Sequence, residues 1–173
     1  MSDLPLHPIL VHFPIALGVI FPLLSFGVWL LIKKQLVSHW AWAPVVFMSL
    51  LYFVSAKLSE EAGEKDEELV EKILPEKYLE AHEEAGETIP PIAGIVLLAS
   101  IGTLALKGKT WPGLVLTVIS AAAVAPLIRA GHTGGQLVYK YNAARAHTEV
   151  SCSAIEKNKP IKDHEDHKDH EDD

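Results

Sequence analysis

Four long apolar stretches, separated by polar segments, dominate the chain and predict four membrane-spanning helices. The stretches cover residues 8–32, 40–58, 89–106 and 111–128. Each has at least 18 residues, which is about the length that a helix needs to cross a hydrocarbon core. A buried soluble helix is also apolar, but the remaining polar sequence is too short to cover four of them. We therefore expect an all-α, integral membrane four-helix bundle in one domain, residues 1–147.

The polar sequence is concentrated in one connection and in the tail. Residues 60–87 carry twelve acidic side chains against three lysines and are expected to form an acidic helical segment between spans two and three. Residues 131–135 contain three glycines and are expected to form a turn, followed by a short helix over 136–147. The tail, residues 148–173, is low in complexity and His/Asp-rich, which predicts disorder. It could collect metal ions weakly or act only as a solubilising acidic tail.

The charges of the short loops predict the orientation in the membrane. Lys33 and Lys34 follow the first span, Lys107 and Lys109 follow the third, and neither loop contains an acid. An excess of lysine places loops in the cytoplasm. Both termini and the acidic segment are then expected on the periplasmic side of a bacterial inner membrane. Residues 1–5 lack the basic start of a cleaved signal peptide, so the first stretch is expected to remain as a span.

Four histidines are brought to the same outer face by this topology. His7 and His12 begin the first span, His82 precedes the third, and His132 follows the fourth. Titratable side chains at membrane depth are costly, so they indicate a functional site. His7 and His12 are five residues apart, which is about 7.5 Å of rise and roughly 140° of rotation on a straight helix. We therefore expect different roles for these two histidines.

Two kinds of centre fit the four imidazoles. A metal site without haem would use His7, His12, His82 and His132 with Glu83 or Glu87, a ligand set that suits Zn, Cu or Fe. The other is a haem held by two of the histidines. The single Cys152 belongs to no Cys-x-x-Cys-His motif, which excludes covalent c-type attachment.

Several motifs resemble those of a known family. They are the run His-Pro-Ile-Leu-Val-His-Phe-Pro-Ile-Ala-Leu at residues 7–17, Gly-Glu at 63–64, His-Glu at 82–83 and Gly-His-Thr-Gly-Gly-Gln-Leu-Val-Tyr at 131–139. Over residues 4–142 the chain resembles a bacterial membrane family labelled a domain of unknown function (number 2231). That family is similar in design to two-haem b-type membrane cytochromes, so the resemblance implies one or two b haems. Because all candidate ligands lie at one face, a ladder of haems across the membrane is not expected.

The favoured hypothesis is a b-type haem protein that transfers electrons to a periplasmic redox partner. His12 and His132 are the first choice of axial ligands, with His7 and His82 left for a second haem or for propionates. Arg129 is expected to pair with a propionate. A non-haem metal protein and a structural membrane subunit whose acidic segment docks a basic partner remain alternatives.

Other function classes are less well indicated. No Ser–His–Asp or Cys–His arrangement suggests an enzyme. The net charge of −7 on an apolar chain argues against nucleic acid as a partner. The lipid bilayer is the expected environment. Assembly with a second copy or with a larger membrane complex stays open.

Overall fold

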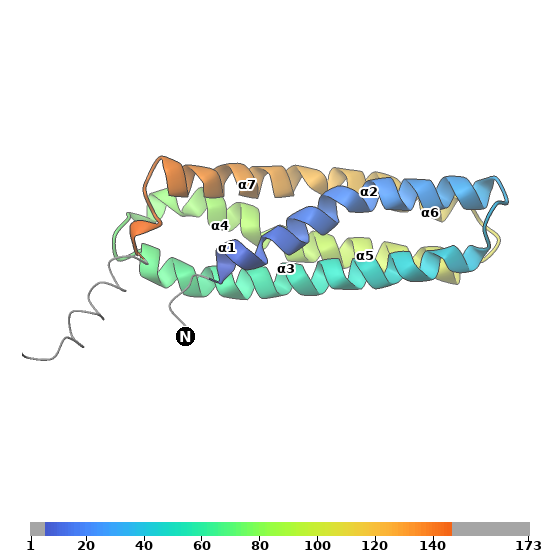
Figure 1. The fold of residues 1–173 in the computed structure, drawn as a ribbon, viewed down its shortest axis with the longest axis horizontal. Coiled ribbons are helices and arrows are strands. Elements are labelled where there is room, and N and C mark those ends of the chain that lie inside the picture. Colours follow the sequence, from blue (N-terminus) through green and yellow to red (C-terminus); the bar gives the residue numbers. More distant parts are fainter. Residues whose placement is uncertain (1–5, 147–173) are drawn as a thin grey trace, which may run out of the picture.

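The computed structural model describes residues 6–146, which form a bundle of four long helical rods (Figure 1). The first rod consists of α1 (His7–Leu10) and α2 (His12–Lys33), and the second of η1 (His39–Ala41) and α3 (Trp42–Val70). The third consists of α4 (Glu80–Glu87) and α5 (Ile89–Ala105), and the fourth of α6 (Trp111–Ala122) and α7 (Val124–Tyr139). A short helix, η2 (Glu76–Tyr78), lies in the turn from α3 to α4. The described residues contain no strand.

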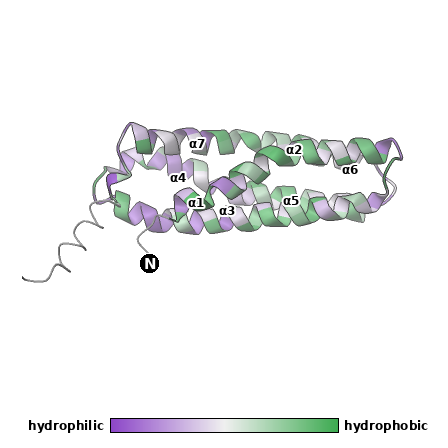
Figure 2. Cartoon of the chain, in the orientation of Figure 1, coloured by the Kyte–Doolittle hydropathy of each residue, from purple (hydrophilic) through white to green (hydrophobic). Residues whose placement is uncertain are grey.

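Each rod is long and apolar enough to cross a membrane. The candidate spans are His7–Lys33, His39–Val70, Glu80–Ala105 and Trp111–Tyr139. Figure 2 shows the apolar residues along the middle of the bundle and the polar ones gathered mainly at the end that contains α4. Large apolar side chains such as Leu23 (74% exposed) and Leu98 (70% exposed) project outward from this middle region, as lipid-facing residues do. The predicted all-α, four-span architecture is confirmed.

Each rod packs against two neighbours, so the four rods form a closed square. α2 packs against α3 and α6, and α5 packs against the same two helices. The interior combines apolar side chains with small hydroxyls: the Ser49 and Ser100 oxygens lie 2.6 Å apart, and the Ser25 and Ser120 oxygens 3.4 Å apart. Small residues and interhelical hydroxyl contacts are the usual means of close helix packing in a membrane.

The first rod is interrupted near its N-terminus. α1 ends at Leu10 and α2 begins at His12, with Val11 between them. Pro14 has no N–H to donate to the Leu10 carbonyl, so one regular helical hydrogen bond is missing at this point. The break allows α1 to lie against α3 at the end of the bundle.

The expected turn over residues 131–135 is wrong, because α7 continues as a helix through these glycines to Tyr139. Glycine is unfavourable in a helix by only about 1 kcal/mol per residue, and packing of α7 against α4 compensates for that cost. The hydroxyl of Thr133 lies within hydrogen-bonding distance of the Arg129 and Ala130 carbonyls, which is also compatible with a helix. Of the expected helix over 136–147, residues 136–139 form the last turn of α7, residues 140–144 are not helical, and residue 147 lies outside the described residues. The rod thus extends beyond the apolar stretch.

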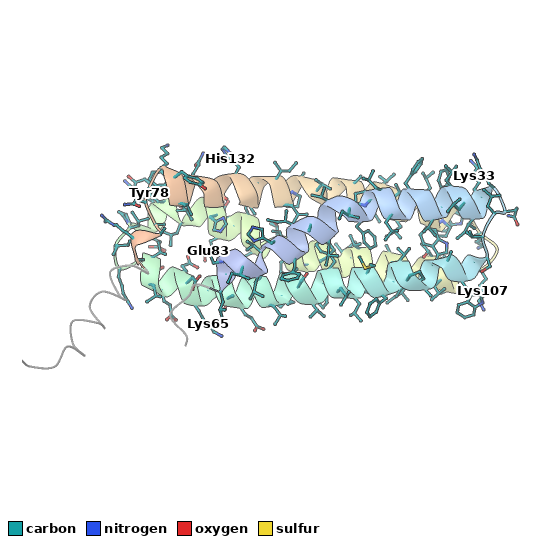
Figure 3. All side chains as sticks on the ribbon, viewed as in Figure 1. Lys33, Lys65, Tyr78, Glu83, Lys107 and His132 are labelled. Carbon is teal, nitrogen blue, oxygen red and sulfur yellow. The ribbon has the colours of Figure 1, made fainter. Side chains whose placement is uncertain are left out.

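The two ends of the bundle differ in chemistry. Lys33 and Lys107 lie at one end, and Lys65, Tyr78, Glu83 and His132 lie towards the other (Figure 3). At the lysine end, the ammonium of Lys107 lies 5.2 Å from the ring centroid of Trp40. The first and last described residues lie at the opposite, acidic end. The predicted tail, residues 148–173, lies outside the described residues.

Candidate functional site

Two of the four histidines face each other at the acidic end of the bundle. The imidazoles of His7 and His82 have ring centroids 6.0 Å apart and planes inclined by 80°. His7 begins α1, which packs against α3, and His82 lies on α4, which packs against α7. Both side chains are half-buried. Residues 75 positions apart in sequence therefore form one pair.

The orientation of the His7 ring is fixed by a backbone carbonyl. Its Nδ1 atom lies 2.9 Å from the Ser59 carbonyl oxygen on α3. A carbonyl only accepts hydrogen bonds, so Nδ1 carries the proton and donates it. In the neutral ring the other nitrogen, Nε2, then keeps a free lone pair, which is the form that binds a metal.

The His82 ring is fixed by a hydroxyl in a similar way. Its Nδ1 atom lies 3.1 Å from Thr133 Oγ1, which is itself 3.1 Å from the carbonyl oxygens of both Arg129 and Ala130. The His82 ring thus has a fixed hydrogen-bond partner on α7. In the tautomer in which Nδ1 donates to Thr133, Nε2 of His82 also keeps a lone pair.

Glycines make room for both imidazoles. A Cβ on Gly63 of α3 would lie 3.1 Å from His7 Nδ1 and Cε1, and a Cβ on Gly134 of α7 would lie 3.0 Å from His82 Cε1. Both distances are tighter than ordinary contacts of a Cβ atom. Any larger residue would therefore push a ring away from its present position.

A cavity of about 100 Å³ lies beside His7. Most of its wall is apolar and comes from all four rods. The lining includes His7, Pro14, Ala56, Ile89, Leu127 and Ala130. Of the paired imidazoles, His7 thus lies next to a space inside the bundle.

The comparison with protein families bears on this site. A family model described as "Predicted membrane protein (DUF2231)" matches residues 3–147. The chain belongs to this family. The match covers both imidazoles and the residues that hold them, and it leaves the whole tail, residues 148–173, outside. No curated protein and no solved structure matches the chain.

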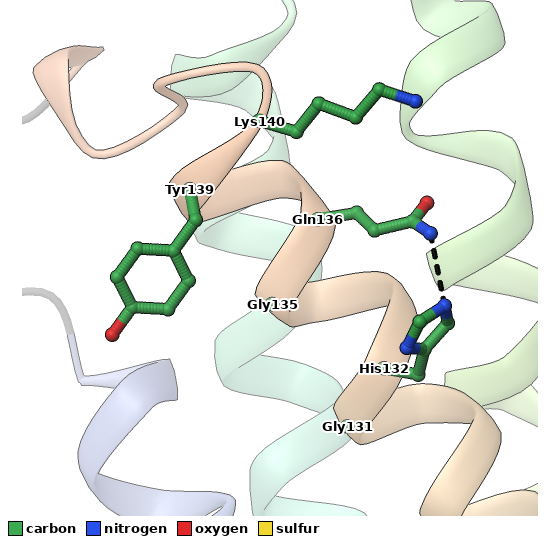
Figure 4. A pocket seen from close by; sticks show the side chains of 6 residues that line it. All are labelled: Gly131, His132, Gly135, Gln136, Tyr139 and Lys140. Atoms are coloured by element: carbon green, nitrogen blue, oxygen red, sulfur yellow. Dashed lines mark hydrogen bonds between the residues drawn. The ribbon is translucent and has the colours of Figure 1, made fainter.

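The other two histidines of this DUF2231 chain lie on outward faces. His12 is the first residue of α2 and is exposed. His132 is exposed as well, and its Nε2 atom lies 2.9 Å from Gln136 Nε2. It lines a shallow groove on α7 with Gly131, Gly135, Gln136, Tyr139 and Lys140 (Figure 4). The structure therefore pairs His7 with His82 rather than His12 with His132.

The charged residues proposed as ligands or as propionate partners are exposed at the same end of the DUF2231 bundle. Glu83 and Glu87 lie on the outside of α4, and Arg129 forms an ion pair with Glu84 at 2.9 Å. Among residues 6–146, no three His, Cys, Asp or Glu side chains form a group that could hold a metal ion. The predicted set of four histidines and two glutamates is thus not gathered around one point.

Sequence reasoning missed four residues of the site. Gly63 and Gly134 lie in two of the motifs quoted from the sequence, but the room that they leave for the imidazoles depends on which helices meet. Thr133 stands next to a predicted ligand and could have been suspected as its partner. Ser59 left no signal, because it acts through a backbone carbonyl that any residue would supply.

Proposed function

We propose that this protein binds haem b with His7 and His82 as the two axial ligands and transfers electrons at the acidic end of the bundle. The observation that carries the proposal is the pairing of two half-buried imidazoles whose Nδ1 atoms are each hydrogen-bonded to a neighbouring helix. Such outer hydrogen bonds set the tautomer of a metal-binding histidine and raise its basicity. His7 is thereby held in the tautomer that a metal ion requires.

The separation of the rings supports this assignment. With metal–nitrogen bonds of about 2.0–2.1 Å, an ion in line between two imidazoles holds their centroids about 6.3 Å apart. The observed separation is 6.0 Å. The separation of the ring centroids is thus close to the one that a shared metal ion requires.

The number of available ligands favours haem over an isolated metal ion. A protein zinc site generally uses three or four side-chain ligands, whereas only two imidazoles are paired in the described part of the chain. Haem iron needs only two axial ligands from the protein, since the porphyrin supplies the other four nitrogens. This is why we prefer haem to Zn, Cu or Fe bound alone.

The proposed role is electron transfer rather than catalysis. When bound, haem supplies a one-electron redox centre, and two histidine ligands leave no open position for a substrate. Arg129 lies at the same end of the bundle, where it now pairs with Glu84. It is our candidate for a propionate partner, and it would leave Glu84 to bind the propionate. The acidic surface at this end suits a basic redox partner. We propose that this surface faces the periplasm, because the lysine-containing loops lie at the opposite end of the bundle.

An absorption spectrum of detergent-purified protein, oxidised and then reduced with dithionite, tests the proposal. We expect a Soret band and a sharp α band in the wild-type protein. His7→Ala and His82→Ala should each lose the low-spin spectrum, while the matched controls His12→Ala and His132→Ala should keep it. Absence of a reducible spectrum in protein supplied with haem would refute the proposal, and loss only in the two control variants would refute the ligand assignment.

A further inference from the structure

The lysine end of the bundle carries positive charge that no nearby acid balances. Its two loops contain four exposed lysines, which we call the lysine patch: Lys33, Lys34, Lys107 and Lys109. The sequence has no Asp or Glu from residue 4 to 59 or from residue 88 to 148. Every acid among residues 6–146 therefore lies in the segment 60–87, towards the opposite end. The countercharge for the lysine patch must come from its surroundings.

Contacts between the rods hold the two lysine loops together. His39 Nε2 lies 2.9 Å from the Leu104 carbonyl oxygen, which joins the start of the second rod to the end of the third. Trp29 Nε1 donates to the Thr110 carbonyl oxygen at 3.0 Å, which joins the first rod to the start of the fourth. The lysines of both loops therefore belong to one surface and not to two separate ones.

Tryptophan rings restrict the positions of two of the ammonium groups. The Nζ atom of Lys33 lies 4.9 Å from the ring centroid of Trp29, and that of Lys107 lies 5.2 Å from the ring centroid of Trp40. A cation is attracted to the face of an indole ring at such distances. An ammonium group has three N–H donors, so each of these placed ammonium groups can also donate to an anionic oxygen.

The side chains around the lysine patch are apolar or aromatic, which favours lipid over a soluble acidic partner. Leu36 is 66% exposed, Trp40 is 64% exposed and Trp111 is 56% exposed. Tryptophan is enriched where a membrane meets water, because its ring is apolar and its N–H is polar. Exposed apolar side chains beside lysines thus indicate that the patch lies at the level of the lipid headgroups.

We propose that the lysine patch binds the headgroup phosphate of an anionic phospholipid in the leaflet at this end of the bundle. The ammonium groups of the patch donate to the phosphate oxygens, and the exposed tryptophans lie beside the upper part of the acyl chains. A neutral phospholipid binds less well, because its own cation already balances the phosphate. The inference does not depend on haem, because it uses none of the residues that hold His7 and His82.

Quenching of tryptophan fluorescence by brominated lipids tests the proposal. The tryptophans of the chain all lie at the lysine end, so their fluorescence reports on lipid at this end alone: Trp29, Trp40, Trp42 and Trp111. The protein is reconstituted into bilayers that mix phosphatidylglycerol and phosphatidylcholine, with one or the other lipid dibrominated. We expect the wild type to prefer phosphatidylglycerol at least about fivefold, the effect of one lysine at an anionic membrane surface.

The double variant Lys33→Gln/Lys107→Gln should lower this preference at least about fivefold, and Lys33→Arg/Lys107→Arg, which keeps both charges, should retain it. The matched control is Lys77→Gln/Lys140→Gln, because these exposed lysines also lie over aromatic rings, those of Tyr78 and Tyr141 at the acidic end. It should keep the preference of the wild type.

Three results would overturn the inference. The first is equal quenching of the wild type by the two brominated lipids, and the second is an unchanged preference in Lys33→Gln/Lys107→Gln. The third is loss of the preference in excess inorganic phosphate but not in sodium chloride of the same ionic strength, which would mean that the lysine patch binds free phosphate and not a lipid headgroup.

Discussion

Replacing Gly134 by alanine tests whether the site is packed around His82. The new Cβ would lie 3.0 Å from His82 Cε1, whereas ordinary contact begins at 3.4 Å. The ring would have to move by about 0.4 Å, and its hydrogen bond to Thr133 opposes this movement. Overpacking typically costs about 1–3 kcal/mol, while alanine in place of glycine favours a helix by about 1 kcal/mol. We expect a net loss of up to about 2 kcal/mol.

Gly102→Ala is the matched control, because no atom lies within 4 Å of its new Cβ. It should raise stability by up to about 1 kcal/mol through helix propensity alone. Unfolding of both variants in mixed detergent, followed by the helical circular dichroism signal, measures the difference. If Gly134→Ala is as stable as Gly102→Ala, the imidazole is not confined and our account of the glycine is incorrect. In haem-loaded protein, Gly134→Ala should also lower haem affinity, whereas Gly102→Ala should not.

Three further substitutions probe the bundle. Ser49→Ala removes the 2.6 Å contact with the serine of α5 and should cost about 0.6 kcal/mol, at most about 1.7, in detergent unfolding; no change would mean that the hydroxyl pair only fills space. Gly113→Ala places a Cβ 2.5 Å from buried Trp42 and should cost about 1–3 kcal/mol in the same assay, so an unchanged midpoint would contradict this packing. Arg129→Gln breaks an exposed ion pair with Glu84 and should cost less than about 1 kcal/mol, a loss that high salt removes; a larger, salt-independent loss would indicate a buried role.

The rods could be predicted from the sequence because membrane helices are marked by length and apolar composition. Their topology also predicted that four histidines meet at one end of the bundle, and the structure brings two of them, His7 and His82, together. The direction in which each histidine points could not be obtained in this way. His12 stands in an apolar run and was the first choice of axial ligand together with His132, yet it is exposed at the start of α2.

The reason is that a membrane helix is apolar on its lipid-facing side as well as in its core. Hydropathy therefore does not distinguish a residue that faces lipid from one that faces another helix. The break at Val11 adds to the difficulty, because it separates the face of His7 from that of His12. The helix through residues 131–135 was predicted as a turn for a related reason. The glycine content of this segment does not show that it packs against α4, which stabilises the helix.

Every rod contributes a part to the paired imidazoles. His7 comes from the first rod, the Ser59 carbonyl and Gly63 from the second, His82 from the third, and Thr133 and Gly134 from the fourth. During synthesis the site consequently cannot exist until the last rod has entered the membrane. A ligand of this site can therefore bind only the fully inserted protein and not a partly inserted chain. By mass action, such a ligand would favour complete insertion. The centre would then act as a checkpoint for assembly, in addition to any chemistry that it performs.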